Sequence, residues 1–191
     1  MKLIDRSAEC RLKTAARTAP ISAIVLHWSG GLGDAAQVER TLLARGYGYH
    51  YVIDPRGVVT QLCAHDRVAR HASGLNERSI GVCLVGLGFG PSRKSSKKWD
   101  MTFKPKKTFF LGRSRAMYAY PKEQLDALRT LCTHICEAES IPFSVAENRR
   151  LSAPELNRFK GIMGHFHQHL TKLDPGPFPL DFLREVCAET P

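Results

Sequence analysis

The chain has 191 residues, of which 43% are hydrophobic and 24% are charged, and its formal net charge is +10. This length suits one domain with a substantial core, predicted over residues 1–191, and the composition is that of a globular protein. No stretch approaches the ~20 apolar residues of a membrane span. The charged N-terminal residues 1–20 hold no apolar run of the kind that marks a signal peptide, so we expect synthesis in the cytoplasm.

The first half of the chain predicts strands around one helix. Residues 21–28 form a short apolar, β-branched run that predicts a buried strand, with His27 near its end. After a glycine-rich turn, Asp34 and Gln37 form a capping box, and the helix that follows is expected to run to about Arg45 and stop at Gly46. Residues 49–62 predict a β-hairpin around Asp-Pro-Arg-Gly, and residues 79–88 predict another buried strand.

The second half predicts a long helix, a last strand and a closing helix. Apolar residues at 125, 128, 132, 135 and 136 keep helical spacing, and Pro121 suits the first turn of that helix. Residues 161–166 predict the last strand and residues 179–187 the closing helix. Strands and helices therefore alternate around a mostly apolar sheet, which predicts a single-domain α/β fold.

A basic segment, residues 91–118, interrupts this pattern. It carries nine lysines and arginines against a single acid, Asp100. Such an excess favours anionic partners, namely nucleic acid, anionic lipid or an anionic cell envelope, and the alternative is a solvated, partly mobile insertion. We predict that the segment tunes substrate engagement without building the core. Aromatic residues among its lysines are of the kind that stack on bases: Trp99, Phe103, Phe109 and Phe110.

The cysteines do not form a recognisable metal or redox motif. None of the six stands in a C-x-x-C pair, and without an export signal we expect them to be mostly reduced. Cys132 and Cys136 lie one helical turn apart among leucines, which indicates a core-facing side of the helix. We predict that no cysteine takes part in the chemistry; the six are Cys10, Cys63, Cys83, Cys132, Cys136 and Cys187.

Candidate metal ligands follow two of the predicted strands. His27 ends one strand and His165 another, so both imidazoles reach the same rim if the strands are neighbours in the sheet. Asp174 is a candidate third ligand, and Lys172 stands two residues before it, on the same side of an extended chain. Three such ligands with a fourth position left open would make a catalytic zinc site. The alternative is that the histidines are packed or solvated and that Asp174, before a proline, belongs to an ordinary turn.

Three stretches together resemble the zinc-dependent N-acetylmuramoyl-L-alanine amidase family, which includes phage lysozymes of amidase type and peptidoglycan recognition proteins. They read GYHYVIDPRGVV, RHASGLNERSIGVCLVG, and GH followed by KLDPGP. The resemblance covers residues 21–88 and 120–185 and leaves out the basic segment. It implies a central mixed β-sheet flanked by helices, with one zinc ion in a surface cleft.

The resemblance also implies roles for individual residues. The zinc ligands would be His27, His165 and Asp174, with His167 as the second choice for the middle ligand and His169 facing solvent. Tyr49 and Lys172 match the catalytic residues of the family, and His71 and Asn76 match positions that touch substrate. Cytosolic members carry a glutamate on the strand that here offers Cys83 and Val85, so the role of that glutamate would fall to Tyr49.

The implied reaction is hydrolysis of the amide bond that joins N-acetylmuramic acid to L-alanine in peptidoglycan, by water that zinc activates. Lys172 would stabilise the oxyanion, and Tyr49 would orient the water or relay its proton. Other hypotheses remain open: a peptidoglycan-binding protein without turnover, or a basic protein that binds nucleic acid or a polymerase. We expect a monomer that acts on the cell wall after release or secretion, as an endolysin, an injected effector with a cognate inhibitor, or a housekeeping hydrolase.

Overall fold

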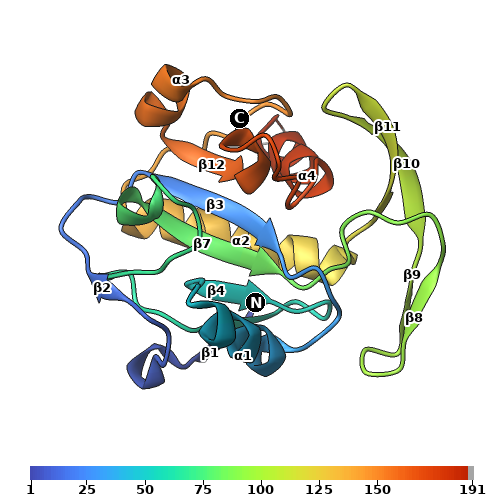
Figure 1. The fold of residues 1–191 in the computed structure, drawn as a ribbon, viewed down its shortest axis with the longest axis horizontal. Coiled ribbons are helices and arrows are strands. Elements are labelled where there is room, and N and C mark those ends of the chain that lie inside the picture. Colours follow the sequence, from blue (N-terminus) through green and yellow to red (C-terminus); the bar gives the residue numbers. More distant parts are fainter. Residues whose placement is uncertain (189–191) are drawn as a thin grey trace.

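The computed structural model describes residues 1–188, with side chains described for residues 1–186. A central six-stranded sheet has the strand order β1-β5-β4-β7-β3-β12 (Figure 1). β4 and β5 are antiparallel and the other neighbouring pairs are parallel, so the sheet is mixed. The strands span Lys2–Asp5 (β1), Ala23–Trp28 (β3), Tyr51–Ile53 (β4), Val58–Gln61 (β5), Ser79–Leu84 (β7) and Gly161–Gly164 (β12).

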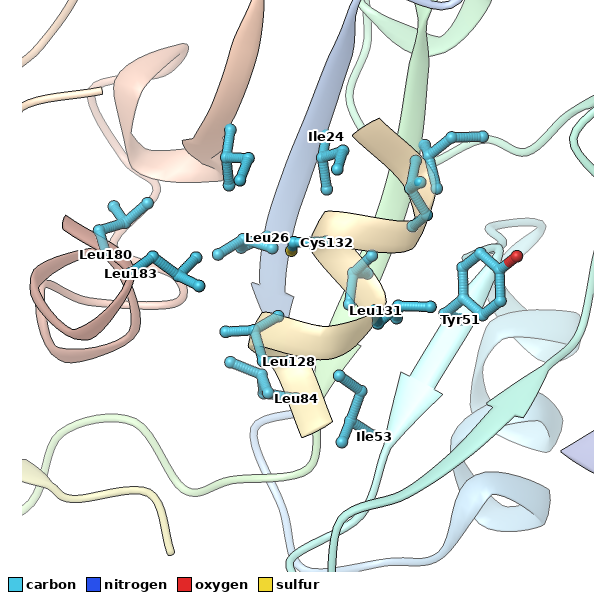
Figure 2. Packing of buried hydrophobic residues seen from close by; sticks show 14 of the residues in the cluster. Ile24, Leu26, Tyr51, Ile53, Leu84, Leu128, Leu131, Cys132, Leu180 and Leu183 are labelled. Atoms are coloured by element: carbon cyan, nitrogen blue, oxygen red, sulfur yellow. The ribbon is translucent and has the colours of Figure 1, made fainter. Parts of the chain in front are cut away.

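Helices cover both faces of this sheet. α2 (Lys122–Ala138) and α4 (Phe178–Ala188) pack on one face, and α1 (Ala35–Arg45) packs on the other. Figure 2 shows Leu128 and Leu131 of α2 among side chains of the strands, with Leu180 and Leu183 of α4 beside them. Side chains alternate along each strand, so Ile24 and Leu26 enter this core while His27 points to the opposite face.

Local chemistry accounts for the boundaries that were predicted correctly. The capping box of α1 is present: the Asp34 side chain accepts from the Gln37 N–H at 2.8 Å, and the helix ends at Gly46 with a φ of 66°. The hairpin within residues 49–62 is also present, because Asp54 Oδ1 accepts from the N–H of Arg56 and of Val58 and closes the turn between β4 and β5. The predicted first strand, hairpin and long helix are thus confirmed.

Other predicted boundaries shift by a few residues. The strand expected at 79–88 ends at Leu84, and α2 begins at Lys122, so Pro121 is its N-cap. The last strand, expected at 161–166, ends at Gly164 and is followed by a 3-10 turn, His165–His167. The chain turns there because the N–H of Phe166 donates to the carbonyl of Asp174 at 3.0 Å. The closing helix is α4, one residue longer at each end than expected.

Several short elements were not predicted. They are β1, the two-strand pair β2 (Ala15–Ala16) and β6 (Arg67–Val68), and α3 (Ala153–Arg158). β1 lies at one edge of the sheet and leaves Leu3 46% and Ile4 40% exposed. At the opposite edge the chain at residues 144–146 covers β12, since the N–H of Ile162 donates to the Ser144 carbonyl and that of Ala146 to the Ile162 carbonyl.

The basic segment forms two β-hairpins that make an arm along one side of the molecule (Figure 1). Their strands are β8 (Lys94–Ser96), β9 (Met101–Phe103), β10 (Pro105–Phe110) and β11 (Arg113–Tyr118). The expectation that this segment does not build the core is wrong, since Phe110 and Met117 are buried in the main core beside α2 and α4. The lysine-rich composition of the segment gave no sign that Phe110 of β10 and Met117 of β11 pack into the core.

Among the described residues, no helix is both long enough and apolar enough to cross a membrane. Cys10, Cys63, Cys83 and Cys132 are free thiols in the structure. The side chain of Cys187 lies outside the described residues, and the expected redox state of the cysteines stays a prediction.

Candidate metal centre

Two of the candidate ligands reach the same rim because their strands are parallel neighbours. β3 and β12 pair with Leu26 opposite Gly164, so the next residues, His27 and His165, leave the two strands at the same level. His27 lies on the face of the sheet that α1 covers, at the C-terminal end of β3. The ring centroids of the two histidines are 4.6 Å apart.

Asp174 completes a group of three. The loop after His165 returns to the sheet, and Asp174 Oδ2 lies 3.0 Å from Nδ1 of His27 and 3.1 Å from Nδ1 of His165. One ligand atom from each residue lies within 4.8 Å of the others. The side chains of all three are largely buried, with exposed fractions of 1% for His27, 11% for His165 and 12% for Asp174.

This donor set fits zinc. Zinc bonds of about 2.1 Å to imidazole nitrogen and carboxylate oxygen place tetrahedral ligand atoms roughly 3.3 Å apart, close to the spacing from Asp174 to each histidine. Two histidines and one carboxylate are also a known ligand set of catalytic zinc sites, which leave the fourth position open.

The protonation states of these side chains suit a metal. Burial lowers the pKa of His27 to about 4, so its imidazole is neutral at pH 7 and offers a lone pair. Burial would raise the pKa of the Asp174 carboxyl, but its contacts with His165 and His27 outweigh that effect and hold the pKa below its ordinary value. A neutral imidazole and an ionised carboxylate are the forms that bind metal ions.

Tyr49 and His71 lie against His27. The ring centroids of Tyr49 and His27 are 4.8 Å apart, and burial raises the pKa of Tyr49 well above its ordinary value, so the phenol keeps its proton. Nδ1 of His71 lies 3.1 Å from Nε2 of His27, and Nε2 of His71 lies 3.3 Å from Oγ of Ser79. A Cβ on Gly81 would come within 2.7 Å of the His71 ring, so only glycine leaves room for it.

Lys172 and Asn76 take different positions. Lys172 is exposed on the loop that carries Asp174, near enough for its charge to contribute to the lowered pKa of His27. Asn76 holds the chain at His71, because its Oδ1 accepts from the N–H of His71 at 2.9 Å and of Ala72 at 2.7 Å. Contact of either His71 or Asn76 with substrate stays a prediction.

A hollow of about 200 Å³ lies between α1 and the loops beside the metal centre. Tyr49 and Ser29 line its inner end, and Gln37, Arg45 and Tyr47 line the part toward α1. Both polar and apolar side chains line this hollow, and none of the three candidate ligands is among them. The predicted zinc ion in a surface cleft therefore stays a prediction.

Most of the chain matches the model of one protein family. The family model described as N-acetylmuramoyl-L-alanine amidase matches residues 17–177, a range that includes all three candidate ligands. The chain belongs to this amidase family. The predicted family and the predicted single-domain α/β fold are therefore confirmed.

Solved structures of amidases share the fold. The N-acetylmuramoyl-L-alanine amidase LysC from Clostridium intestinale matches with a TM-score of 0.66 and 16% identity, over 98% of each chain. The Ph2119 endolysin of a Thermus scotoductus bacteriophage has a TM-score of 0.61 and 18% identity, over 96% of this chain and 97% of its own. AmiD from E. coli, solved with anhydro-N-acetylmuramic acid-L-Ala-D-γ-Glu-L-Lys, has a TM-score of 0.58 and 22% identity, over 90% and 60%. Among curated proteins, no sequence matches the chain.

Two other histidines of the amidase lie away from the metal centre. His167 is buried; its Nδ1 lies 3.0 Å from the Gly164 nitrogen and its Nε2 lies 2.6 Å from the Glu147 carbonyl oxygen, so both ring nitrogens contact backbone. His169 is exposed, and its Nδ1 faces Thr171. The structure therefore places His165, not the second choice His167, beside His27 and Asp174.

Cys83 lies on a strand near the proposed cleft, as the sequence predicts. Cys83 lies opposite His27 in the register of β3 and β7, and its buried side chain packs on the face of the sheet that α1 covers. Burial raises the pKa of Cys83 well above its ordinary value, so the thiol is protonated at neutral pH. The expectation that no cysteine takes part in the chemistry stays a prediction.

Proposed function

We propose that the protein is a zinc-dependent N-acetylmuramoyl-L-alanine amidase that cleaves the bond between the lactyl group of N-acetylmuramic acid and L-alanine in peptidoglycan. The observation that carries the zinc dependence is the meeting of His27, His165 and Asp174, with ligand atoms within 4.8 Å of one another. Membership of the amidase family supports the bond that is cleaved.

The three ligands would hold one zinc ion, which when bound polarises an amide carbonyl and lowers the pKa of a water from ~15.7 toward ~7. His71 would keep the His27 ring in place, because its Nδ1 would accept a hydrogen bond from Nε2–H of His27 while Nδ1 of His27 faces the ligand group. Ser79 fixes His71 in turn. This chain of contacts orients the first ligand without using any substrate atom.

Tyr49 and Lys172 would act on the reacting atoms. Tyr49 keeps its phenol proton at neutral pH, so it can donate a hydrogen bond to the substrate or orient the attacking water. The Lys172 ammonium, on the loop next to Asp174, would stabilise the negative charge that develops on the amide oxygen. The buried strand beside His27 offers Cys83 and Val85 and no carboxylate, which leaves the proton transfer to Tyr49.

Removal and return of the metal test this function. The purified protein is treated with a chelator, and release of soluble peptide from purified peptidoglycan is measured before and after addition of one equivalent of Zn²⁺. We expect activity to disappear and return with the zinc content. Peptide release that persists in metal-free protein would contradict the zinc dependence, and no release by the zinc-loaded protein would contradict the reaction.

A second candidate is a peptidoglycan-binding protein without turnover. Members of the family that lost the metal usually lack the third ligand, and the presence of Asp174 beside both histidines favours the enzyme. A protein that binds peptidoglycan, takes up no zinc and releases no peptide would favour the binding protein instead.

We infer an endolysin-type role, in which the enzyme acts on the cell wall after release. The likeness of fold to a phage endolysin supports this role. An injected effector with a cognate inhibitor, or a housekeeping hydrolase, would use the same catalytic residues. A neighbouring gene for a pore-forming protein would support the endolysin, and one for a small inhibitor would support the effector.

A further inference from the structure

A basic groove lies between the arm and the loop that carries Asp174. Its volume is about 480 Å³, and it is lined by Arg113 and Arg115 of β11, Arg150, and apolar side chains that include Leu111, Leu170 and Leu173. None of its lining residues is acidic. A concave surface with one sign of charge concentrates ligands of the opposite sign.

The three arginines carry charge that the protein does not neutralise. None of them forms an ion pair with a carboxylate among the residues that the structure describes. Arg150 donates to the backbone carbonyls of Phe166, His169 and Leu170, so it holds this loop while its charge stays uncompensated. Arg113 is exposed. Nε of Arg115 is buried and has no hydrogen-bond partner within the described part of the chain.

Arg115 lies against aromatic rings that pack at the end of β3. Its guanidinium lies over the ring of Phe89 at 5.3 Å, and Phe89 packs edge-on against Trp28, the residue after His27, with centroids 5.5 Å apart. On the other wall, Leu173 directly precedes Asp174. The groove therefore borders the candidate active site on the side of the Asp174 loop.

The structure argues against nucleic acid as the occupant. Binding of single strands needs exposed aromatic rings on which bases stack. In the basic segment, Trp99, Phe103 and Phe110 are at most 7% exposed, and Phe109 is the exposed aromatic ring, at 76%. The groove offers guanidinium groups and exposed aliphatic surface, including Leu170 at 82% exposure, but no stacking platform.

We propose that Arg113 and Arg115 bind an oxyanion of the cell wall, a phosphate or a carboxylate carried by the same polymer that the metal centre cleaves. A guanidinium binds such groups through two parallel N–H donors, and neither Arg113 nor Arg115 forms an ion pair with a carboxylate among the described residues. The inference rests on the proposed function, since it assigns the groove to the substrate of that reaction. Binding there would hold the wall polymer beside the Asp174 loop.

The test compares Arg113→Glu with Arg129→Glu, a matched control that makes the same charge change on the exposed side of α2. Co-sedimentation of each protein with purified, insoluble cell wall gives the bound fraction. We expect Arg113→Glu to weaken wall binding about threefold to tenfold and to flatten its salt dependence, with little change for Arg129→Glu. Arg115→Gln, which removes the charge and keeps a polar side chain, should weaken binding in the same direction. Equal losses in Arg113→Glu and Arg129→Glu would overturn the proposal.

Walls stripped of their phosphate polymers distinguish the two sources of the oxyanion. If the difference between wild type and Arg113→Glu disappears on stripped walls, the ligand is a phosphate; if it remains, the ligand is a carboxylate. Unchanged wall binding together with weakened DNA binding in Arg113→Glu would contradict the groove as a wall site. Hydrolysis of a soluble muropeptide by the wild type reports on the proposed function separately, and its absence would refute that function without bearing on the comparison of Arg113→Glu with Arg129→Glu.

Discussion

Asp174 faces both histidines through one oxygen, Oδ2, and is therefore the residue whose loss should damage the metal centre most. We expect Asp174→Ala to lose both zinc and amidase activity, because two imidazoles hold zinc much less tightly than a full set of three ligands. Zinc analysis and peptide release from purified peptidoglycan, on the same preparation, measure both effects.

His169→Ala is the matched control, since this exposed histidine on the same loop contacts Thr171 and not the metal ligands. It should keep both zinc and activity. His167→Ala should also keep zinc wherever it folds. Loss of zinc in folded His167→Ala, with zinc retained in His165→Ala, would show that the middle ligand is two residues further along the chain than proposed.

Lys172 separates catalysis from metal binding. Lys172→Ala should keep its zinc, because the side chain is exposed and is no part of the ligand group, and should lose ~10²–10³-fold in turnover if it acts as one oxyanion donor. The readouts are zinc content and the rate of muropeptide hydrolysis at saturating substrate. Full activity in this variant would make Lys172 an ordinary solvated residue.

His50 makes stability depend on pH from outside the metal centre. The imidazole accepts from the Gly81 N–H through Nδ1 at 3.0 Å, and burial lowers its pKa from 6.5 to about 3. Between pH 6.5 and about pH 3, His50 is protonated in the unfolded chain but stays neutral in the folded protein. The free energy of unfolding is therefore unaffected by His50 above pH 6.5 and decreases as the pH falls through this window.

The loss due to His50 amounts to at most about 1.4 kcal/mol per pH unit. Urea unfolding of the metal-free protein from pH 7 to pH 4 measures this loss of stability. His50→Asn is the comparison variant, because its side chain keeps a hydrogen-bond acceptor and a donor but does not titrate in this range. The variant should show a shallower decline of the free energy of unfolding. If the free energy of unfolding depends on pH with the same slope in both proteins, His50 does not cause the loss of stability at low pH.

At the scale of elements, the hairpin β10–β11 is both a basic surface and a part of the core. Phe110 is 1% exposed and stacks edge-on against Phe166, with centroids 4.7 Å apart, whereas its neighbour Phe109 is 76% exposed. Phe110→Ala should lower the free energy of unfolding by about 3–5 kcal/mol, and Phe109→Ala should change it by less than about 0.5 kcal/mol. Denaturant unfolding of the two variants checks this, and equal effects would mean that the hairpin does not dock as described.

The packing of the same hairpin against the core could not be predicted from the sequence. Apolar residues with helical spacing predicted α2, and an apolar run predicted β3. Both elements bury many side chains, so their sequences carry a strong apolar pattern. In β10 and β11 the lysines and arginines dominate the composition, and only the pairing of the two strands places Phe110 and Met117 where they meet the core. β1 was missed because four residues at a sheet edge, largely exposed, carry almost no apolar pattern.

At the scale of the whole molecule, the candidate metal ligands join β3 to the end of β12 and the loop at Asp174, which lie more than a hundred residues further along the chain. Zinc bound only by the folded protein should raise its melting temperature, by an amount that grows with the free zinc concentration. Thermal unfolding with and without Zn²⁺ measures this shift in the wild type and in Asp174→Ala, which should not respond. A similar shift in both would place the bound zinc elsewhere.

The candidate site was predictable from sequence to the extent that its residues end strands or follow motifs. The strand ends indicated His27 and His165, the loop that follows His165 indicated Asp174 and Lys172, and the family motif added Tyr49. The contact between His71 and His27 could not be read from the chain, since it depends on the space left by Gly81 on a different strand. The groove at Arg113 and Arg115 was equally hidden, because its walls come from segments some fifty residues apart.

The open edge of the sheet has a practical consequence for anyone who handles this protein. β12 is covered by the chain at residues 144–146, but β1 ends the sheet with its backbone groups turned outward and two aliphatic side chains half exposed. Such an edge is a template on which a strand from another molecule can add, and the charges of Lys2 and Asp5 are the main features that discourage it. An N-terminal tag that extends β1 with apolar residues would promote aggregation, so a charged linker there is the better choice for concentrated samples.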